Sequence, residues 1–279
     1  MNNTVHVESD NTPVKATRIA TWLLAHGKAA VTTEELAGIL GIPNDHVRQR
    51  LAPLRRQRDM VSPARGLWIP VPPEFNEWGA PPAIEIIDAM MKHLETGYYV
   101  GWLSAAAFLG AAHHAPQVFQ VATSKSIRSR TVGRSRFQFL HRENLMALTT
   151  FTVETRSGSV PVSTRAVTLL DIASDIGMVG GIQGAVNLII ELCDTELCDT
   201  DEPIERELSD IAQHFPAATL RRLGWIMENF TNIRGLEPLA KMADDLTRHP
   251  SLLDPSRPYS GKTDAIWRLN INTEVKPDV

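Results

Sequence analysis

The sequence has few cysteines and no long hydrophobic run, and each shortage excludes a class of protein. Cys193 and Cys198 are the only cysteines among 279 residues, so no disulfide framework can hold the chain together. The longest uncharged apolar stretch, residues 97–112, is shorter than the roughly 20 residues that span a bilayer. The first 15 residues lack the basic start and apolar core of a secretory signal. We therefore expect a cytoplasmic protein that contacts no membrane.

The composition excludes intrinsic disorder and is typical of a globular protein. The chain is 43% hydrophobic and 22% charged, which is enough apolar material to bury a core. A length of 279 residues suggests two domains. Five prolines lie between Pro70 and Pro82, and proline at that density stiffens a chain and ends strands. We therefore predict a first domain over residues 14–71, a proline-rich linker over 72–82 and a second domain over 83–279.

The net charge of −4 conceals a strong separation of charge along the chain. Residues 46–70 contain six arginines and one acid, and residues 120–142 contain six further basic residues and no acid. The sign reverses in residues 190–210, which contain nine acids and one arginine. Arginine that is concentrated in an otherwise acidic protein favours local contact with a polyanion.

The first arginine-rich segment belongs to a predicted helix-turn-helix. Thr32 is followed three residues later by Glu35, an arrangement in which each side chain caps a backbone N–H at a helix start. Gly41 ends that short helix, and Asn44, a favoured N-cap residue, begins the next. Apolar residues recur four and seven positions after Val47, which leaves the arginines on the opposite face. In a helix-turn-helix, the second helix enters the major groove of DNA.

The flanking residues extend this motif into a predicted winged helix. An apolar helix over residues 16–24 precedes the motif, and residues 60–71 follow it as a β-hairpin. Arg65 lies at the tip of the hairpin, where an arginine suits a phosphate or the minor groove. Pro53 would break the hydrogen bonding of a regular helix, so we expect a kink or a separate turn there.

The predicted winged helix is expected to bind double-stranded DNA. Arg48 and Gln49, near the start of the second helix of the motif, are expected to contact base edges. Arg55, Arg56 and Arg65 are expected to contact phosphates, which position a protein without reading sequence. The complete set of predicted DNA-binding residues is Arg48, Gln49, Arg50, Arg55, Arg56 and Arg65. Two alternatives stay open: a solvated basic helix face, and a winged helix that docks a protein.

The second half of the chain mixes strands and helices. Strands are predicted over residues 98–102, 118–122 and 137–140, with a hairpin over 150–162. From residue 163 the apolar spacing becomes helical, and a last strand is predicted near residues 267–272. The fold class is therefore α+β: an N-terminal winged helix-turn-helix followed by a larger mixed α/β domain with a small sheet and several helices.

Two stretches of the second half resemble a known family. They are YYVGWLSAAAFLGAAHHAPQVFQVATSK, from Tyr98 to Lys125, and VPVSTRAVTLLDIA, from Val160 to Ala173. Both are similar to signatures of the AbiEi family of type IV antitoxins, in which a winged helix precedes them. The order of these parts, more than any one of them, supports the resemblance.

The resemblance implies a bacterial antitoxin with two activities. Its N-terminal domain would bind inverted repeats in its own promoter and repress the operon, and its C-terminal domain would counter a nucleotidyltransferase-like toxin. The implied partners are double-stranded operator DNA and that toxin, and direct contact between the two proteins is left open. The alternative class is a transcriptional regulator whose C-terminal domain senses a small ligand.

Motifs for catalysis and metal binding are weak, so we expect neither an enzyme nor a cofactor. Residues 177–181, GMVGG, lack the preceding strand and the lysine of a phosphate-binding loop and are predicted to be a turn between helices. His113 and His114 are adjacent, but no cysteine or carboxylate cluster lies near them in the sequence. Cys193 and Cys198 lie in a tandem repeat, ELCDTELCDT, which a duplication explains more simply than metal binding.

A nuclease is the enzyme class that needs most care, because a mixed domain with basic residues could cleave nucleic acid. That chemistry uses carboxylates gathered around a metal ion, usually beside a lysine. Glu143, Glu154 and Asp171 are scattered along the sequence, and Lys262 stands alone. We therefore expect no nuclease.

The second basic stretch keeps three interpretations. Its residues are Lys125, Arg128, Arg130, Arg134 and Arg136. It lies where the family varies, so any role rests on its charge. The stretch extends the DNA contact, binds RNA or the nucleotide substrate of the toxin, or is simply solvated.

Overall fold

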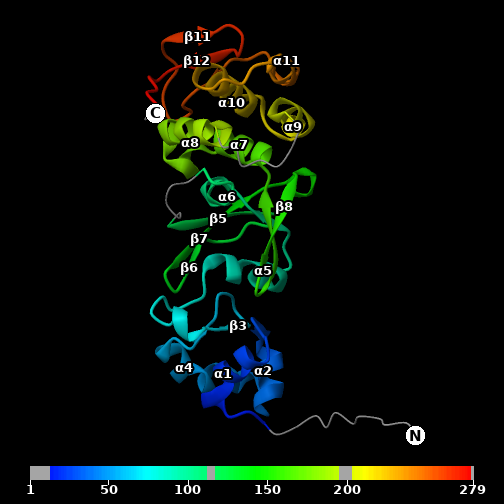
Figure 1. Ribbon diagram of the computed structural model, residues 1–279, viewed down its shortest axis with the longest axis vertical. Coiled ribbons are helices and arrows are strands. Elements are labelled where there is room, and N and C mark those ends of the chain that lie inside the picture. The colour runs from blue at the N-terminus through cyan, green and yellow to red at the C-terminus, as the bar shows by residue number, and fades with distance from the viewer. Residues whose placement is uncertain (1–12, 112–116, 195–202, 278–279) are drawn as a thin grey trace, which may run out of the picture. The chain divides into compact units, whose positions relative to one another are not determined.

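The chain forms two compact units in the computed structural model (Figure 1). The structure describes residues 13–111, 117–194 and 203–277. The first unit contains the chain up to Leu94 together with two short hairpin tips, residues 131–135 and 156–158. The second unit contains residues 95–130, 136–155 and those from 159 onwards. The fold is α+β, as predicted.

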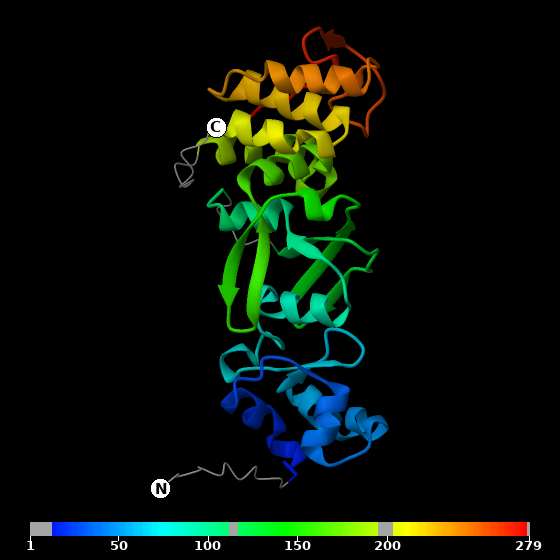
Figure 2. The ribbon, with the colours of Figure 1, turned by 90° about the vertical axis from the view of Figure 1, so that its right-hand side faces the viewer.

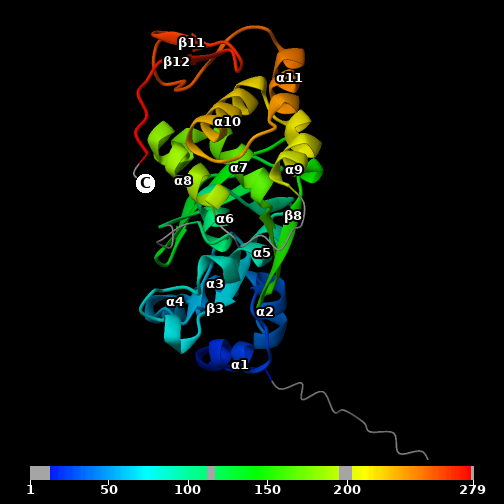
Figure 3. The ribbon, with the colours of Figure 1, turned by 45° about the horizontal axis from the view of Figure 1, so that its top comes forward.

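The first unit begins with a winged helix made of short helices and a three-stranded sheet (Figure 3). In chain order its elements are η1 Ala16–Arg18, α1 Ile19–Ala25, β1 Val31–Thr32, α2 Thr33–Leu40, α3 Asn44–Arg50, α4 Ala52–Gln57, β2 Met60–Val61 and β3 Leu67–Pro70. The strand order is β1-β3-β2, and both pairings are antiparallel. The predicted hairpin is thus present, and β1 adds a third strand to it. Ile19, Leu36 and Val47 belong to the buried core.

The start of α2 confirms the predicted capping box. The Thr32 hydroxyl oxygen accepts a hydrogen bond from the backbone N–H of Glu35 at 3.1 Å. The Glu35 carboxylate accepts one from the backbone N–H of Thr32 at 2.7 Å. Gly41 ends the helix in the left-handed conformation at φ 64°, which glycine adopts without steric cost.

The next helix differs from its prediction in one detail. Asn44 is the first residue of α3, and the predicted N-cap role for it is wrong, because the extended Pro43 occupies the N-cap position and no side chain caps the helix. The predicted break at Pro53 is confirmed. α3 ends at Arg50, Leu51 forms the corner, and Pro53 lies in the first turn of α4, where a missing N–H breaks no helical hydrogen bond.

The proline-rich segment and the helix after it lie within the first unit. Residues 72–82 contain the short helix η2 Pro73–Phe75, and α5 Ala83–His93 follows them. The Thr33 side chain accepts a hydrogen bond from the Trp68 indole N–H at 2.9 Å, which joins α2 to β3.

The two hairpin tips of the first unit each contain a glycine that no larger residue could replace. Gly133 has φ 57°, and a Cβ there would lie 2.5 Å from the carbonyl oxygen of Trp78. Gly158 has φ 140°, and a Cβ there would lie 2.5 Å from a carboxylate oxygen of Asp88. Both separations are far below contact distance, so the close packing of each tip requires glycine.

The second unit is built on a six-stranded mixed sheet. Its strands are β4 Tyr98–Val100, β5 Val118–Thr123, β6 Arg130–Val132, β7 Ser135–His141, β8 Thr150–Thr155 and β9 Gly158–Ser163, in the order β6-β7-β5-β4-β9-β8. β4 pairs antiparallel with β5 and parallel with β9, and β5 pairs parallel with β7. The strands predicted over 118–122 and 137–140 and the hairpin predicted over 150–162 are confirmed.

The strand predicted over residues 98–102 is shorter than expected. It ends at Val100, because Gly101 is the N-cap of α6 Trp102–Phe108. Trp102 has a positive φ of 49°, an uncommon conformation for a bulky residue. The turn carries the Trp102 side chain into the core, where it is fully buried.

Helices are stacked on one side of this sheet (Figures 1 and 2). α6 contacts both β5 and α7, so it lies between the sheet and the helices that follow. The later elements are η3 Leu145–Ala147, α7 Arg165–Ser174, η4 Ile176–Val179, α8 Gly181–Asp194, α9 Ile204–Ile211, η5 Ala212–His214, α10 Ala217–Phe230, α11 Glu237–Leu246, β10 Ser251–Leu252, β11 Lys262–Asp264 and β12 Leu269–Ile271. Their apolar faces form one core. Among the described residues, no helix combines the length and hydrophobicity needed to cross a bilayer.

Two details of these helices bear on the predictions. The turn predicted at residues 177–181 is confirmed: it connects α7 to α8 through η4, with Gly180 and Gly181 in left-handed conformations. The terminal strand, predicted near residues 267–272, covers only residues 269–271. Trp267 lies outside it and is buried instead.

Candidate functional site

The predicted base-contacting residues lie on the solvent face of α3. Val47 is fully buried beneath the helix, whereas Arg48, Gln49 and Arg50 are all exposed. The apolar stripe therefore holds α3 against the core of the winged helix and leaves its polar side chains available to a ligand. Arg48, Gln49 and Arg50 come from one helix, as a contact with the edges of neighbouring bases requires.

The arginines of α4 border a shallow surface pocket. Arg55 and Arg56 are exposed and line a pocket of about 430 Å³ together with Met60, Val61 and Gly79. A basic pocket open to solvent is suited to a phosphate group, which arginine binds through paired N–H donors.

The wing tip is fixed through its backbone. The carbonyl oxygen of Arg65 accepts a hydrogen bond from His93 Nε2 at 2.9 Å. The carbonyl oxygen of Gly66 accepts one from the backbone N–H of Thr33 at 2.8 Å. The Arg65 side chain is exposed, so the tip presents an arginine from an anchored loop.

The structure divides the second basic stretch, and Arg134 lies in the first unit. The backbone N–H of Arg134 donates a hydrogen bond to the carbonyl oxygen of Trp78 at 2.9 Å. Arg134 and Trp78 line a pocket of about 290 Å³ with Arg58 and Glu77, and Gly79 is shared with the pocket of Arg55 and Arg56. Arg134 therefore continues the basic surface of α4, although many residues separate them in the sequence.

Trp78 and Arg58 complete this surface. The Trp78 side chain is 48% exposed, which is unusual for the largest apolar residue. Arg58 ends α4 with φ 65°, and its guanidinium donates a hydrogen bond to the carbonyl oxygen of Glu77 at 3.0 Å. An exposed indole beside arginines is a combination typical of proteins that bind single-stranded nucleic acids, whose unpaired bases can stack on the ring.

The remaining residues of the second basic stretch lie in the second unit and differ in exposure. Lys125, Arg128 and Arg136 are exposed. Arg130 is half-buried, with its guanidinium carbon 5.7 Å from the centre of the Phe139 ring. Burial lowers the pKa of Arg130. The Arg130 guanidinium therefore packs against an aromatic ring, whereas Lys125, Arg128 and Arg136 face solvent.

Arg142, which contributes to the charge of residues 120–142, is part of a buried cluster. One of its terminal nitrogens lies 2.6 Å from a carboxylate oxygen of Asp171 and 2.6 Å from one of Asp175. Its guanidinium also lies over the rings of Trp102, at 5.3 Å, and Phe215, at 5.5 Å. Only 18% of the Arg142 side chain is exposed, so its charge is paired with carboxylates inside the molecule and is not presented to solvent.

Tyr99 and Trp102 complete the cluster around Asp171. The Tyr99 hydroxyl donates to the Asp171 carboxylate at 2.9 Å, and the Trp102 indole N–H donates to the Asp171 carbonyl oxygen at 3.1 Å. Burial raises the pKa of Asp171 to about 7, although Arg142 and the Tyr99 hydroxyl both oppose that rise. Burial also raises the pKa of Tyr99 above its ordinary value.

The cluster joins the two stretches that resemble the antitoxin family. Tyr99 and Trp102 come from the first stretch, and Asp171 comes from the second. Sequence reasoning treated Asp171 as one of several scattered carboxylates and missed this arrangement. A signal was present: Asp171 lies among apolar residues where the spacing is helical, and a carboxylate buried in such a helix requires a cation or hydrogen-bond donors opposite it. The cluster holds α6 against α7 and therefore contributes to the stability of the fold.

The other candidate sites of the sequence show no gathering of ligands. The Glu154 carboxylate accepts a hydrogen bond from Ser159, and Asp171 is committed to Arg142. No group of three His, Cys, Asp or Glu side chains able to hold a metal ion occurs among the described residues. The paired histidines at 113 and 114 and the cysteine at 198 lie outside that part of the chain.

Comparison with known proteins identifies a family for part of the chain. The sequence pattern of the AbiEi antitoxin C-terminal domain matches residues 99–229. The fold is similar to that of the RV2827C protein from Mycobacterium tuberculosis, with a TM-score of 0.63 over 94% of this chain and 92% of that one, at 15% identity. No protein of curated function matches the chain. The matched range starts at Tyr99 and contains the whole cluster around Asp171. Residues 99–229 of this chain are thus an AbiEi antitoxin C-terminal domain.

Proposed function

We propose that this protein is the antitoxin of a bacterial type IV toxin–antitoxin system. In this proposal the antitoxin counters a nucleotidyltransferase-like toxin in the cytoplasm and represses its own operon by binding promoter DNA. The observation that carries the proposal is the presence, in one chain, of an antitoxin domain and a winged helix with an arginine-bearing α3. The role is one of binding, and we assign no catalytic residue to it.

The DNA-binding part of the proposal rests on the first unit. α3 presents Arg48 and Gln49 for base edges, with Arg50 beside them, and Arg55 and Arg56 are available for phosphates. The anchored wing adds Arg65, and the hairpin tip adds Arg134. Inverted repeats in the promoter would be bound by two copies of the protein, since each half-site accepts one recognition helix.

The structure allows the second basic stretch to be considered residue by residue. Arg134 supports an extended DNA contact, because it shares a surface pocket with Arg58 beside the exposed Trp78. Lys125, Arg128 and Arg136 belong to the second unit, and for them all three interpretations stay open: an extended DNA contact, contact with RNA or with the nucleotide substrate of the toxin, and simple solvation. Arg130 is the least suited to a ligand, because it packs on Phe139.

The experiment that tests this proposal separates repression from neutralisation in the full chain. The reading frame beside the gene is expressed in bacteria with the wild-type protein, with the double variant Arg48→Ala, Gln49→Ala, or with Lys241→Ala. Lys241 is an exposed cation of α11 and serves as the matched control. A reporter fused to the promoter of the operon measures repression, and colony counts measure survival.

We expect the wild type and the Lys241→Ala control to restore growth and repress the reporter. The double variant should restore growth and lose repression, because its substitutions lie in the first unit alone. Unchanged repression by the double variant would contradict DNA reading through α3. A neighbouring reading frame that is harmless, or toxic and not countered, would contradict the antitoxin role.

A further inference from the structure

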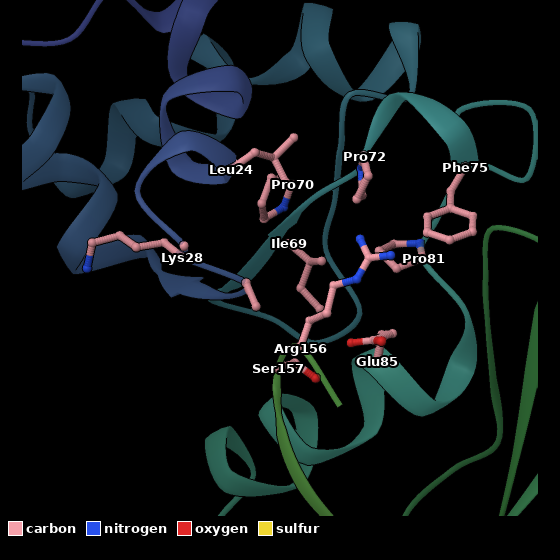
Figure 4. Close-up of a pocket in the computed structure, with 12 residues that line it drawn as sticks. Leu24, Lys28, Ile69, Pro70, Pro72, Phe75, Pro81, Glu85, Arg156 and Ser157 are labelled. Carbon is pink, nitrogen blue, oxygen red and sulfur yellow. The ribbon is translucent and has the colours of Figure 1, made fainter. Parts of the chain in front are cut away.

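The first unit contains an apolar pocket beside α1 and β3 (Figure 4). Its lining shares no residue with the two pockets at the basic surface of α4. It has a volume of about 190 Å³, and the C-terminal end of α1, the strand β3, the proline-rich segment and the hairpin tip 156–158 surround it. Its lining residues are Leu24, Gly27, Lys28, Ala29, Ile69, Pro70, Pro72, Phe75, Pro81, Glu85, Arg156 and Ser157.

The walls of this pocket are suited to an apolar group the size of an aromatic ring. Leu24, Ile69 and Phe75 contribute side chains, and three prolines contribute rings and no N–H donors. A cavity of about 150 Å³ lined by apolar side chains accommodates benzene, so the volume here is sufficient for a substituted ring. Pockets of mainly apolar lining with few polar groups are the usual sites of small ligands.

Charged groups of both signs converge at one side of the pocket. Figure 4 shows the guanidinium of Arg156 and the carboxylate of Glu85 on the same side of the apolar walls, with Ser157 next to them. Arg156 is held by Glu74 at 3.4 Å, an ion pair that is largely exposed. Glu85 is half-buried, and its carboxylate forms no ion pair within the described part of the chain.

The position of Arg156 is set by the tip that carries it. Gly158 approaches α5 so closely that a Cβ would lie 2.5 Å from Asp88, and Lys92 pairs with Asp88 at 2.7 Å. The tip is therefore packed tightly against α5. This packing fixes the backbone position of Arg156, whose guanidinium reaches the pocket. A guanidinium binds a carboxylate through paired N–H donors, and a carboxylate such as Glu85 binds an ammonium group.

We propose that this pocket binds a free apolar α-amino acid. The side chain of the amino acid would fill the proline-lined space, its carboxylate would pair with Arg156, and its ammonium group would pair with Glu85. Arg156 and Glu85 together match this zwitterion better than an anion or a cation alone: an anion would leave Glu85 without a partner, and a cation would leave Arg156 with only its exposed pair to Glu74. Lys28 also lines the pocket, but Figure 4 shows its ammonium group pointing away from Arg156 and Glu85.

The test compares phenylalanine with two analogues that each lack one charge. Phenethylamine lacks the carboxylate, and 3-phenylpropanoate lacks the ammonium group. Binding to the full-length protein is measured by calorimetric titration up to millimolar concentrations. We expect phenylalanine to bind about tenfold more tightly than either analogue, a difference of about 1.4 kcal/mol.

Two conservative variants assign the contacts. Arg156→Gln should remove the advantage of phenylalanine over phenethylamine and keep its advantage over 3-phenylpropanoate. Glu85→Gln should do the reverse. Ala29→Leu, which fills the pocket from its wall, should abolish binding of all three compounds, and circular dichroism checks that each variant is folded.

Three results would overturn the proposal: no binding of phenylalanine by the wild type, equal binding of all three compounds, or phenylalanine binding that neither charge variant weakens. Because this pocket is distinct from the proposed DNA surface, these results leave the proposed antitoxin function standing. Conversely, loss of the antitoxin function would not affect the titrations.

Discussion

The arginines of α3 and α4 in the first unit and Arg142 in the second unit have opposite environments. In the first unit, Arg48, Arg50, Arg55 and Arg56 project from short helices into solvent. In the second unit, Arg142 is enclosed between two carboxylates and two aromatic rings. Arginine side chains are thus exposed to solvent in the first case, and in the second case an arginine joins buried carboxylates and aromatic rings. A count of charges along the chain cannot distinguish these two uses.

Two arginines of α10 extend the pattern of the second unit. Arg221 is 1% exposed, pairs with Asp244 at 3.0 Å and donates to the carbonyl oxygen of Thr247 at 2.5 Å. Arg222 donates to the carbonyl oxygen of Leu253 at 2.8 Å, and burial lowers its pKa to about 10. Both side chains bind the ends of neighbouring segments. Arg142, Arg221 and Arg222 can therefore be lost only at the expense of stability, whereas the exposed arginines of α3 and α4 should be dispensable for folding.

The largest effect should come from breaking the buried cluster. Asp171→Ala removes a carboxylate that accepts from Tyr99 and Arg142, and it leaves Arg142 with Asp175 as its only carboxylate partner. Removal of one partner from a buried ion pair costs about 3–5 kcal/mol. We expect the free energy of unfolding, measured by urea denaturation near pH 7.5, to fall by that amount. Arg48→Ala should leave it unchanged, and an equal loss in both variants would remove the contrast between the units.

A pH series should test the protonation of the same cluster. The folded-state pKa of Asp171, about 7, lies above its unfolded value of 3.8, so unfolding releases a proton between these pH values. The contribution of the protonated carboxyl to stability is complete below pH 3.8 and is lost as the pH rises towards 7. We expect the wild type to lose a few kcal/mol relative to Asp171→Asn over this interval and then to level off. A difference that stays flat across the range would show that Asp171 is ionised in the folded protein throughout.

On the exposed side of the comparison, Arg48→Ala should weaken binding to the operator. Loss of a base contact costs about 1–3 kcal/mol and reduces the preference for the operator over random DNA. Gel-shift titrations with both DNAs measure the two affinities at one salt concentration. Equal losses on both DNAs would make Arg48 a phosphate contact and leave base reading to other residues.

The smallest expected effect concerns Arg134. If it contacts a phosphate, Arg134→Ala should reduce the slope of log K against log salt by about one unit, because one fewer counterion is released. Lys241→Ala, which removes a charge from the second unit, should leave the slope unchanged. An unchanged slope in Arg134→Ala as well would exclude the hairpin tip from the DNA contact and confine the basic surface to the winged helix.

The winged helix was predictable because its signals are local. Thr32 and Glu35 cap the same helix start, Gly41 ends that helix, and Pro53 divides the next one. Each of these effects acts within a few residues and can therefore be predicted from the sequence. Asn44 was misassigned as a cap because only the dihedral angles of its neighbour decide which residue comes first in the helix.

The buried cluster was not predictable, because its contacts join residues far apart in the sequence. Arg142 and Asp171 are 29 positions apart, and Tyr99 and Asp171 are 72 positions apart. Arg142 ends a run of exposed basic residues, and nothing in its immediate neighbourhood distinguishes it from them. The family resemblance covered both ends of the cluster without indicating that they meet. The position of Arg134 in the first unit has the same origin, since a hairpin tip is assigned to a unit only by its packing.

The two glycine-bearing hairpin tips give the first unit a particular order of assembly during translation. The residues of its winged helix all precede Pro72, but Gly133 and Gly158 are made much later. A ribosome adds about 5–20 residues per second, so several seconds pass between the synthesis of Leu94 and that of Gly158. During this interval the surfaces of Ala80 and Asp88 that receive the tips are open. The nascent chain therefore contains the residues of the winged helix before it contains the finished first unit, whose last segment, residues 156–158, is made past the middle of the chain.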